Sequence, residues 1–446
     1  MFRTLVSGCI VAAAMLGACA VHAQSPLLDP SFGQQGLARI NSTIGSPRND
    51  VAVGICPGPG DTQVAISTRL DPAMLMLARV RRDGTLDPAF GIGGRVERAI
   101  EMPNLVLPRN LCFPDGRIEI AYGGFGGTIE VLRFLPDGDA DGSFGMGGRF
   151  SVTVSSLPNA NSGGFSLRGM DRGPGGEILL GGTLVADENS YGRAALLRVR
   201  SNGSLRDARI FDENVFSRGA YIAASAYAPS GDLWVAGGFV GVQMSSWFRM
   251  ELNGATLVGS APVRGTGAYG ENLRINGGRM IRPGVMVLSG IRMLPSVPSL
   301  PVLFVLRENG SSELVLPPPA GGALMVDSTA LGILTLPGDR ILYGGTTNGP
   351  GLYFARAQIG ASSANDTVDS SFGANGAATL SIPGTPAGCK PLQQMARLSV
   401  WGGTPVFVAS ARADCEPGTE ADLVVGLFGI EDVIFANAFE SDVPTL

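Results

Sequence analysis

Short apolar segments recur along the chain, and most of them end in glycine. Val, Ile, Leu, Phe and Tyr dominate them, and flanking Gly, Pro and Asp residues end each one after six to eight residues, which predicts buried β-strands. The starts of successive segments are 52 residues (232 to 284) to 65 residues (340 to 405) apart. The seven copies lie at 63–68, 117–124, 177–182, 232–238, 284–290, 340–345 and 405–410.

A further apolar strand follows each copy. Asp-Gly or Asn-Gly pairs, as in RRDGT and SNGSL, come next in most units, and their tolerance of positive φ suits a tight reversal between antiparallel strands. Each unit is therefore predicted to be a small antiparallel meander. The following strands lie at 74–80, 128–134, 194–200, 247–252, 302–308, 352–358 and 423–429.

A phrase of Phe and Gly links consecutive units, as in LDPSFGQQG, LDPAFGIGG, DGSFGMGG and DSSFGANG. Its phenylalanines are Phe32, Phe90, Phe144 and Phe372, so the first gaps are 58 and 54 residues and the last, 228, is four times 57. This count gives seven units, as the strands do. Such a repeat is typical of sheets that cover one another's faces in a ring. We predict an all-β fold, a seven-bladed β-propeller of four-stranded antiparallel blades.

The two ends of the repeat region complement each other. The last unit has three predicted strands but no Phe-Gly phrase after them, whereas the chain begins with such a phrase, at 28–36. Residues 37–40 are therefore expected to supply the fourth strand of the last blade. This pairing would close the ring and cover two exposed sheet edges.

The first residues are typical of an export signal. Arg3 precedes an apolar run that ends in the triplet VHA, so cleavage is expected before Gln24. Alternatively, LGAC resembles a lipoprotein signal, in which Cys19 would be acylated. No other apolar run reaches the ~20 residues of a membrane-spanning helix. We predict a periplasmic, cell-surface or extracellular protein with a signal peptide at 1–23, the propeller at 24–431 and a tail at 432–446.

Charge and histidine content exclude several classes of function. The chain has 33 basic and 38 acidic residues without a basic cluster, so nucleic acid is not an expected partner. The single histidine, His22, lies within the predicted signal peptide. A Ser-His-Asp triad and a histidine-ligated zinc site are therefore not expected in the mature protein.

Four cysteines follow the predicted signal peptide, and disulfides are the default in an oxidising compartment. Cys389 and Cys415 flank the first two strands of the last unit, and we expect this pair to form. Cys56 and Cys112 occupy equivalent places in the first two units. We rank their pairing lower, because neighbouring blades are expected to hold them beyond the ~4.4–6.8 Å between Cα atoms that a disulfide needs.

One acidic segment resembles a calcium loop. Asp137, Asp139 and Asp141 alternate before a glycine, an arrangement of oxygen ligands that Ca²⁺ prefers. An EF-hand would require glutamate where Gly148 stands. Two of the three aspartates also belong to the repeated DGxxD pattern, which gives them a structural explanation. Calcium is the one cofactor for which the sequence provides a candidate site.

The repeat resembles that of the delta-60 family, bacterial β-propeller-like proteins with a period near 60 and a core phrase close to DGslDxsFGxxG. The resemblance covers residues 28–430, although the units near Gly203, Gly254 and Gly310 keep only the Asn-Gly turn. It implies the propeller fold and an exported location, but no activity. The tail motif IFANAFE looks like short endings of some exported bacterial proteins.

The sequence favours a monomeric, non-catalytic module that binds a protein or a glycan. The alternative is a histidine-free hydrolase or lyase that acts on sugars or lactones through paired carboxylates at the ring axis, with or without calcium. Its carboxylate candidates are Glu97, Glu101, Glu119 and Glu130, which share no motif. Convergence of two carboxylates at one mouth of the ring would favour the enzyme.

Overall fold

The described residues of the computed structural model consist mainly of β-strands. Within the described residues, the helical elements are three 3-10 turns, Val154–Ser156, Pro174–Gly176 and Ser363–Asn365. In this part of the chain no helix is long and apolar enough to cross a membrane. The prediction of an all-β fold is confirmed. The structure describes residues 27–40, 50–70, 73–100, 108–123, 127–158, 160, 163–185, 192–211, 220–228, 231–239, 245–250, 263–264, 273–294, 297–308, 310–319, 332–347, 351–382, 395–412 and 421–429.

The strands follow the predicted meanders along the chain. Those of the first half are β1 (Leu37–Ile40), β2 (Val51–Gly58), β3 (Thr62–Leu70), β4 (Ala73–Arg81), β5 (Arg95–Ala99), β6 (Arg109–Cys112), β7 (Ile118–Gly123), β8 (Thr128–Phe134), β9 (Arg149–Thr153), β10 (Gly164–Arg172), β11 (Ile178–Val185), β12 (Arg193–Val199) and β13 (Leu205–Ile210). Those of the second half are β14 (Ala220–Tyr227), β15 (Leu233–Phe239), β16 (Ser245–Met250), β17 (Val263–Arg264), β18 (Leu273–Arg282), β19 (Val285–Leu294), β20 (Val297–Arg307), β21 (Gly310–Val315), β22 (Gly332–Leu336), β23 (Arg340–Thr346), β24 (Gly351–Gln358), β25 (Thr367–Val368), β26 (Ala377–Ser381), β27 (Met395–Trp401), β28 (Thr404–Arg412) and β29 (Ala421–Leu427).

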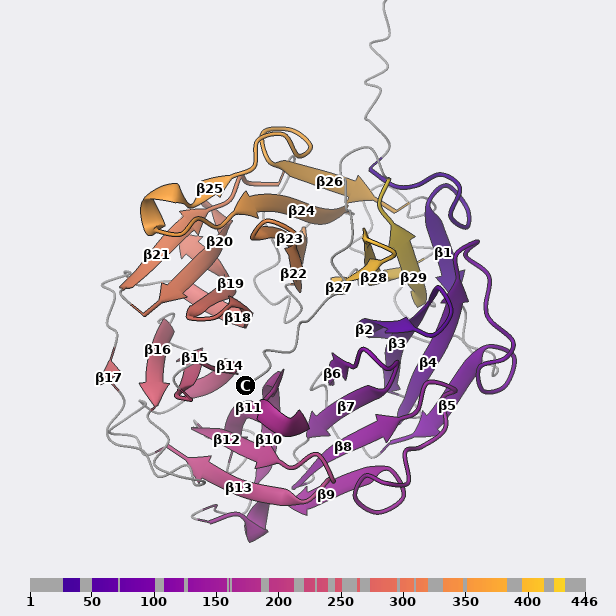
Figure 1. Ribbon diagram of the computed structural model, residues 1–446, viewed down its shortest axis with the longest axis vertical. Coiled ribbons are helices and arrows are strands. Elements are labelled where there is room, and N and C mark those ends of the chain that lie inside the picture. The colour runs from indigo at the N-terminus through magenta and orange to yellow at the C-terminus, as the bar shows by residue number, and fades with distance from the viewer. Residues whose placement is uncertain are drawn as a thin grey trace, which may run out of the picture.

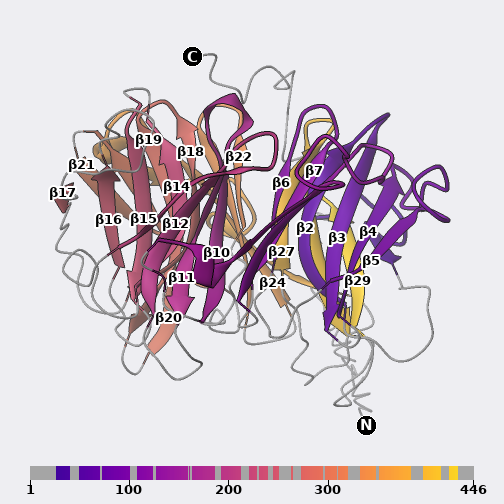
Figure 2. The same cartoon turned by 90° about the horizontal axis from the view of Figure 1, so that it is seen from below.

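The sheets stand around a common centre, as Figure 1 shows along the axis and Figure 2 from the side. The described strands form six four-stranded antiparallel sheets and one five-stranded sheet. The first strand of each unit lies nearest the centre in Figure 1, and each contacts the first strand of the next unit, with β27 contacting β2. This arrangement is a β-propeller. The innermost strands are β2, β6, β10, β14, β18, β22 and β27.

The five-stranded sheet departs from the predicted four strands. Its β24 pairs with β25 over two residues and with β26 over five. In the first sheet the equivalent contact before β5 is the single bridge between Val80 and Leu86. β25 is therefore the start of the outer strand, which the Phe-Gly phrase interrupts before β26. It counts as a separate strand here because it pairs over two residue pairs, whereas the first sheet has one.

The N-terminal segment pairs with the last described strand. β1 runs antiparallel to β29, with Leu37 opposite Gly426 and Ile40 opposite Leu423. The Leu427 N–H also donates to the Gly36 carbonyl at 3.2 Å. β1 therefore covers the edge of β29, whose backbone groups would otherwise lack partners.

The Phe-Gly phrase lies just before the outer strand of four sheets and contacts the sheet that follows. Its four phenylalanines are at most 2% exposed, and each donates its N–H to the carbonyl of the aspartate three residues before it. The following glycine donates to the turn of the next sheet in three copies: Gly33 to Asp83, Gly91 to Asp137 and Gly145 to Asn202. The phrase is therefore a joint between sheets, which explains its repetition without a ligand.

Glycine is required in this joint by its backbone. Gly145 has a φ of 55°, and a Cβ there would lie 2.1 Å from the Arg149 carbonyl oxygen. Its counterpart Gly91 has a φ of 52° and an equivalent clash with the Arg95 carbonyl. An L-residue would be strained by both the conformation and the contact.

In three of the four copies, an arginine near the end of the preceding strand lies over the phenylalanine ring. Arg79 donates to Asp87 at 2.7 Å, and its guanidinium lies 5.0 Å from the centre of the Phe90 ring. Arg356 repeats this arrangement with Asp369 and Phe372. The aspartate also accepts the N–H of the residue two positions later, as in an Asx turn. Hydrogen bonds and a cation–π contact thus hold the phenylalanine in place.

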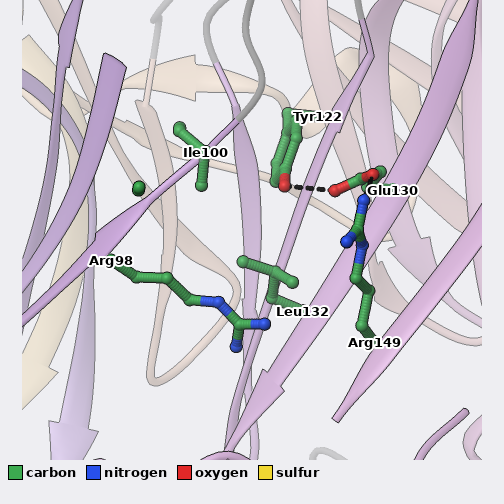
Figure 3. A pocket seen from close by; sticks show the side chains of 7 residues that line it. Arg98, Ile100, Tyr122, Glu130, Leu132 and Arg149 are labelled. Atoms are coloured by element: carbon green, nitrogen blue, oxygen red, sulfur yellow. Dashed lines mark hydrogen bonds and ion pairs between the residues drawn. The ribbon is translucent and has the colours of Figure 1, made fainter. Parts of the chain in front are cut away.

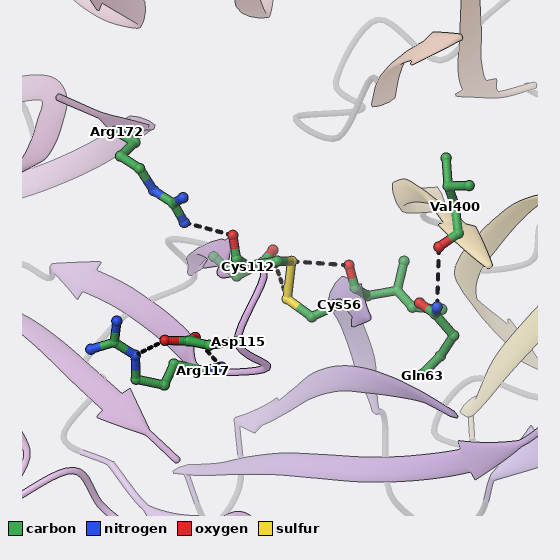
Figure 4. The surroundings of a disulfide bond; sticks show 9 residues. Cys56, Gln63, Cys112, Asp115, Arg117, Arg172 and Val400 are labelled. Carbon is green, nitrogen blue, oxygen red and sulfur yellow. Dashed lines mark hydrogen bonds and ion pairs between the residues drawn. A yellow bond between two sulfur atoms is a disulfide. The ribbon is translucent and has the colours of Figure 1, made fainter. Parts of the chain in front are cut away.

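The described disulfide joins Cys56 on β2 to Cys112 on β6, with 5.3 Å between the Cα atoms (Figure 4). The prediction that these residues lie too far apart is wrong. Both sit on innermost strands, and neighbouring sheets are closest there because they radiate from the axis. Cys389 and Cys415, the pair we had ranked first, lie outside the described residues, as do Cys19, His22 and the tail at 432–446.

Candidate functional site

Arginines occupy the innermost strands at positions where apolar residues would be expected. Arg109 lies on β6, Arg168 on β10, Arg274 and Arg279 on β18, and Arg397 on β27. We call these five residues the axial arginine cluster. Most strand positions elsewhere in the sheets are apolar and buried, so five guanidiniums along the centre of the ring need a specific explanation.

Electrostatic interactions across the ring show that these side chains converge. Arg397 interacts with Asp171 on β10 and with Arg279 on β18, and β27 is adjacent to neither strand. Arg109 interacts with both Arg397 and Arg168. Because the groups belong to sheets that are not neighbours, they meet at the axis and not between two adjacent sheets.

Burial and the charges of neighbouring arginines lower the pKa of two arginines of the cluster. Burial, together with the charges of Arg397 and Arg168, lowers the pKa of Arg109 to about 9. Burial also lowers the pKa of Arg397, although the nearby Asp171 carboxylate raises it in part. Both shifts disfavour the charged guanidinium, so an anion that entered the cluster would relieve an existing repulsion.

Asp171 is the carboxylate that acts on Arg397. Burial raises the pKa of Asp171 to about 6, although hydrogen bonds from Ser225 and the charges of Arg397 and Arg279 lower it. Its carboxylate accepts the Ser225 backbone N–H at 2.8 Å and the Ser225 hydroxyl at 3.1 Å. Asp171 is therefore held on the β14 side, while the arginines approach from other strands.

Fixed contacts position two of the arginines. Arg109 is 6% exposed, and its Nε donates to the Arg168 carbonyl at 2.9 Å. The Arg168 guanidinium lies 5.6 Å from the centre of the Tyr221 ring, and its buried Nε has no hydrogen-bond partner among the described residues. Guanidiniums held in this way are suited to binding carboxylate, sulfate or phosphate oxygens.

The acidic residues considered for catalysis do not converge. Glu119 is buried and ion-paired with Arg133, and Glu130 is ion-paired with Arg149 in the same sheet. Glu97 lies on β5 of another sheet, and Glu101 lies outside the described residues. No second carboxylate is among the described groups that act on Asp171.

Hydrogen bonds to the backbone engage two carboxylates of the candidate calcium loop. Asp137 accepts the Asp139 N–H at 3.0 Å, and Asp141 accepts both the N–H and the hydroxyl of Ser143. In the part of the chain that the structure describes, no three His, Cys, Asp or Glu residues form a group able to hold a metal. The three aspartates are therefore not brought together, because two of them serve local turns.

Sequence reasoning missed the axial arginine cluster. The signal was present, since PRNL, SLRGMD, LRINGGRM and ARLSV place arginine inside the first strand of four units. The positions differ from unit to unit, however, so they do not form a repeated motif. Only the ring closure brings them to one place.

No family model matches the chain, and no curated protein matches it either. Solved structures resemble it in fold. The β-propeller domain of Nup133 from Vanderwaltozyma polyspora is 11% identical and covers 86% of this chain and 99% of its own, with a TM-score of 0.43. The β-propeller domain of the Trilobed protease from Pyrococcus furiosus is 9% identical, covers 88% and 100%, and has a TM-score of 0.40. Hydrazine synthase from Kuenenia stuttgartiensis is 10% identical, covers 88% and 99%, and has a TM-score of 0.49.

Proposed function

We propose that this chain is an exported, non-catalytic propeller that binds an anionic group of a protein or glycan partner at the axial arginine cluster. In this proposal it is a seven-bladed ring of the delta-60 type, closed by β1. The observation that carries the binding role is the meeting of Arg109, Arg279 and Arg397 from three separate sheets. The export signal and the repeated phrase support the location and the family.

The chemistry of the site favours binding over catalysis. Guanidiniums donate hydrogen bonds and stay charged at neutral pH, so they do not serve as proton acceptors there. The hydrolase or lyase alternative needs a pair of carboxylates, and the described surroundings of Asp171 contain arginines and Ser225. No observation favours that alternative.

The test is the binding of charged and uncharged probes by calorimetry. We expect a heparin tetrasaccharide or a hexaglutamate peptide to bind, and maltotetraose not to bind. Arg397→Gln should weaken anion binding about tenfold, since it removes one charged donor. Arg200→Gln, at an exposed turn, is the matched control and should bind as the wild type does. Equal affinity of the two variants, or no binding of either anion, would refute the proposal.

The same experiment has a pH readout. The Asp171 carboxylate competes with the probe for the arginines when it is ionised, above its pKa of about 6. The sulfated probe stays anionic across this range. Its affinity should therefore rise as the pH falls from 7 to 5, and Asp171→Asn should bind at pH 7 as the wild type does at pH 5.

A further inference from the structure

One oxygen of the Asp171 carboxylate has no partner among the described residues. Ser225 donates its backbone N–H at 2.8 Å and its hydroxyl at 3.1 Å, and both bonds go to Oδ2. No hydrogen bond or ion pair within the described part of the chain reaches Oδ1. Since the Asp171 side chain is half-buried, Oδ1 can accept a hydrogen bond from a ligand.

The carboxylate of Glu130, by contrast, has partners on both oxygens. It lines a small pocket away from the axis together with Tyr122 and Arg149 (Figure 3). The Tyr122 hydroxyl donates to Oε2, and the Arg149 guanidinium pairs with Oε1. Tyr122 is 4% exposed and Glu130 is 1% exposed, so their own contacts close this pocket to a ligand. Asp171 differs in both its exposure and its unpaired oxygen.

Three innermost strands place Asp171 beside the arginines. β14, which carries Ser225, lies between β10 and β18 in Figure 1, and Cα atoms of β10 and β18 approach within 8 Å of each other. The charges of Arg279 on β18 and Arg397 on β27 act on Asp171, but neither guanidinium forms an ion pair with it. Both arginines are half-buried. An anion bound between these groups therefore meets guanidinium donors on one side and the acceptor Oδ1 on the other.

This arrangement favours an anion that carries a proton of its own. Hydrogen phosphate and sulfate are tetrahedral dianions of similar size, but only hydrogen phosphate has an O–H. Facing an ionised carboxylate, that O–H donates a hydrogen bond, whereas an unprotonated oxygen is repelled.

We propose that the axial arginine cluster binds inorganic phosphate in preference to sulfate. The phosphate O–H donates to Oδ1 of Asp171, and the other phosphate oxygens accept hydrogen bonds from Arg279 and Arg397. The ligand is the free ion, because the dianion of a phosphate ester has no proton to donate. This inference rests on the anion-binding role proposed above and specifies the anion.

The test is calorimetric titration of the full mature chain with sodium phosphate and sodium sulfate at pH 8 and constant ionic strength. Burial raises the pKa of Asp171 to about 6, so its carboxylate is ionised at this pH. Phosphate should bind at least about tenfold more tightly, the value of one charge-assisted hydrogen bond. Fluorophosphate and methyl phosphate, which are dianions without an O–H at pH 8, should bind as sulfate does. Equal affinity for phosphate and sulfate, or no saturable phosphate binding at tens of millimolar, overturns the proposal.

A variant assigns the selectivity to Asp171. Asp171→Asn should raise the affinity for sulfate and abolish the preference, because the amide can donate to an unprotonated oxygen. Asp83→Asn is the matched control, since Asn202 of another unit makes the same turn bonds to Ser204 that Asp83 makes to Thr85. It should keep the wild-type preference. A tenfold preference retained in folded Asp171→Asn overturns the proposal. If this variant does not fold, the comparison of phosphate with fluorophosphate on the wild type decides the matter.

The outcomes separate this inference from the proposed function. Binding of the heparin tetrasaccharide, together with equal affinities for phosphate and sulfate, overturns the phosphate selectivity and leaves the anion-binding role intact. Absence of binding for the tetrasaccharide, hexaglutamate, phosphate and sulfate refutes both.

Discussion

At the scale of single residues, the repeated phrase is explained by the joint that it forms. Phe144 is completely buried, and the Arg133 guanidinium lies 4.1 Å from its ring centre. Gly145 then donates to Asn202 in the next sheet. The phrase therefore recurs because the four joints that it forms use the same phenylalanine ring and the same left-handed turn. Its recurrence does not indicate a ligand.

Truncation of the Phe144 side chain should therefore destabilise the fold. Phe144→Ala removes a fully buried aromatic side chain and its cation–π contact, and should lower the free energy of unfolding by about 3–5 kcal/mol. Met146→Ala, two residues along the same phrase and 89% exposed, is the control and should change it by less than about 0.5 kcal/mol. Chemical denaturation measures both. A loss of similar size in both variants would contradict the role of the joint.

At the scale of elements, the innermost strands determine which residues meet. Cys56 on β2 and Cys112 on β6 form a disulfide 56 residues apart in sequence. Asn110 on β6 donates to the Cys56 sulfur at 3.3 Å, and a Cβ on Gly54 would lie 2.0 Å from the Asn110 side chain. The two strands thus pack closely at the axis, and the disulfide fastens the first two units to each other.

Loss of this bond should destabilise the fold. The double variant Cys56→Ala and Cys112→Ala should lower the free energy of unfolding by about 2–4 kcal/mol, because the unfolded chain gains the freedom that the cross-link removes. Denaturation with and without dithiothreitol measures this. Dithiothreitol should lower the free energy of unfolding of the wild type by a similar amount. A double variant as stable as the oxidised wild type would show that the bond contributes nothing.

At the scale of the whole molecule, β1 brings residues from the start of the repeat region to the last described strand. Phe32 packs edge-on against Trp401 at 5.6 Å, and the Trp401 indole N–H donates to Asp61 at 2.6 Å. These contacts hold together the segment before β1, the end of β27 and the turn before β3. Residues from the start and from the end of the repeat region therefore pack in the same part of the propeller.

Disruption of β1 tests the proposal that β1 closes the ring. The Gly36 carbonyl accepts the Leu427 N–H, so the alternation of an antiparallel ladder gives Ala38 the next hydrogen-bonded pair with Val425. Ala38→Pro removes that donor and should cost about 1–3 kcal/mol of unfolding free energy. Arg39→Ala on the same strand loses a partly exposed ion pair with Asp422 and should cost at most about 1 kcal/mol. Equal thermal stability of the two variants would argue against closure by β1.

The sequence predicted more of the fold than of the candidate site. The strands and turns repeat with local patterns, and the Phe-Gly phrase marks four of the joints in the sequence. The axial arginines do not repeat, and Asp171 of one sheet is held by Ser225 of the next, so neither leaves a motif. The calcium interpretation of Asp137, Asp139 and Asp141 stays a prediction, because local turns use two of these carboxylates and the structure does not gather all three.

The sequence by itself determined the β-strand content, the position of each meander and the residues of the joints, because alternation, burial and turn preferences act between near neighbours in the chain. Tertiary structure alone decided which residues of different units meet. The bond between Cys56 and Cys112 and the convergence of Arg109 and Arg397 depend on how closely sheets approach at the axis. That distance follows from the packing of all the sheets around one centre. The sequence of a single unit does not specify it.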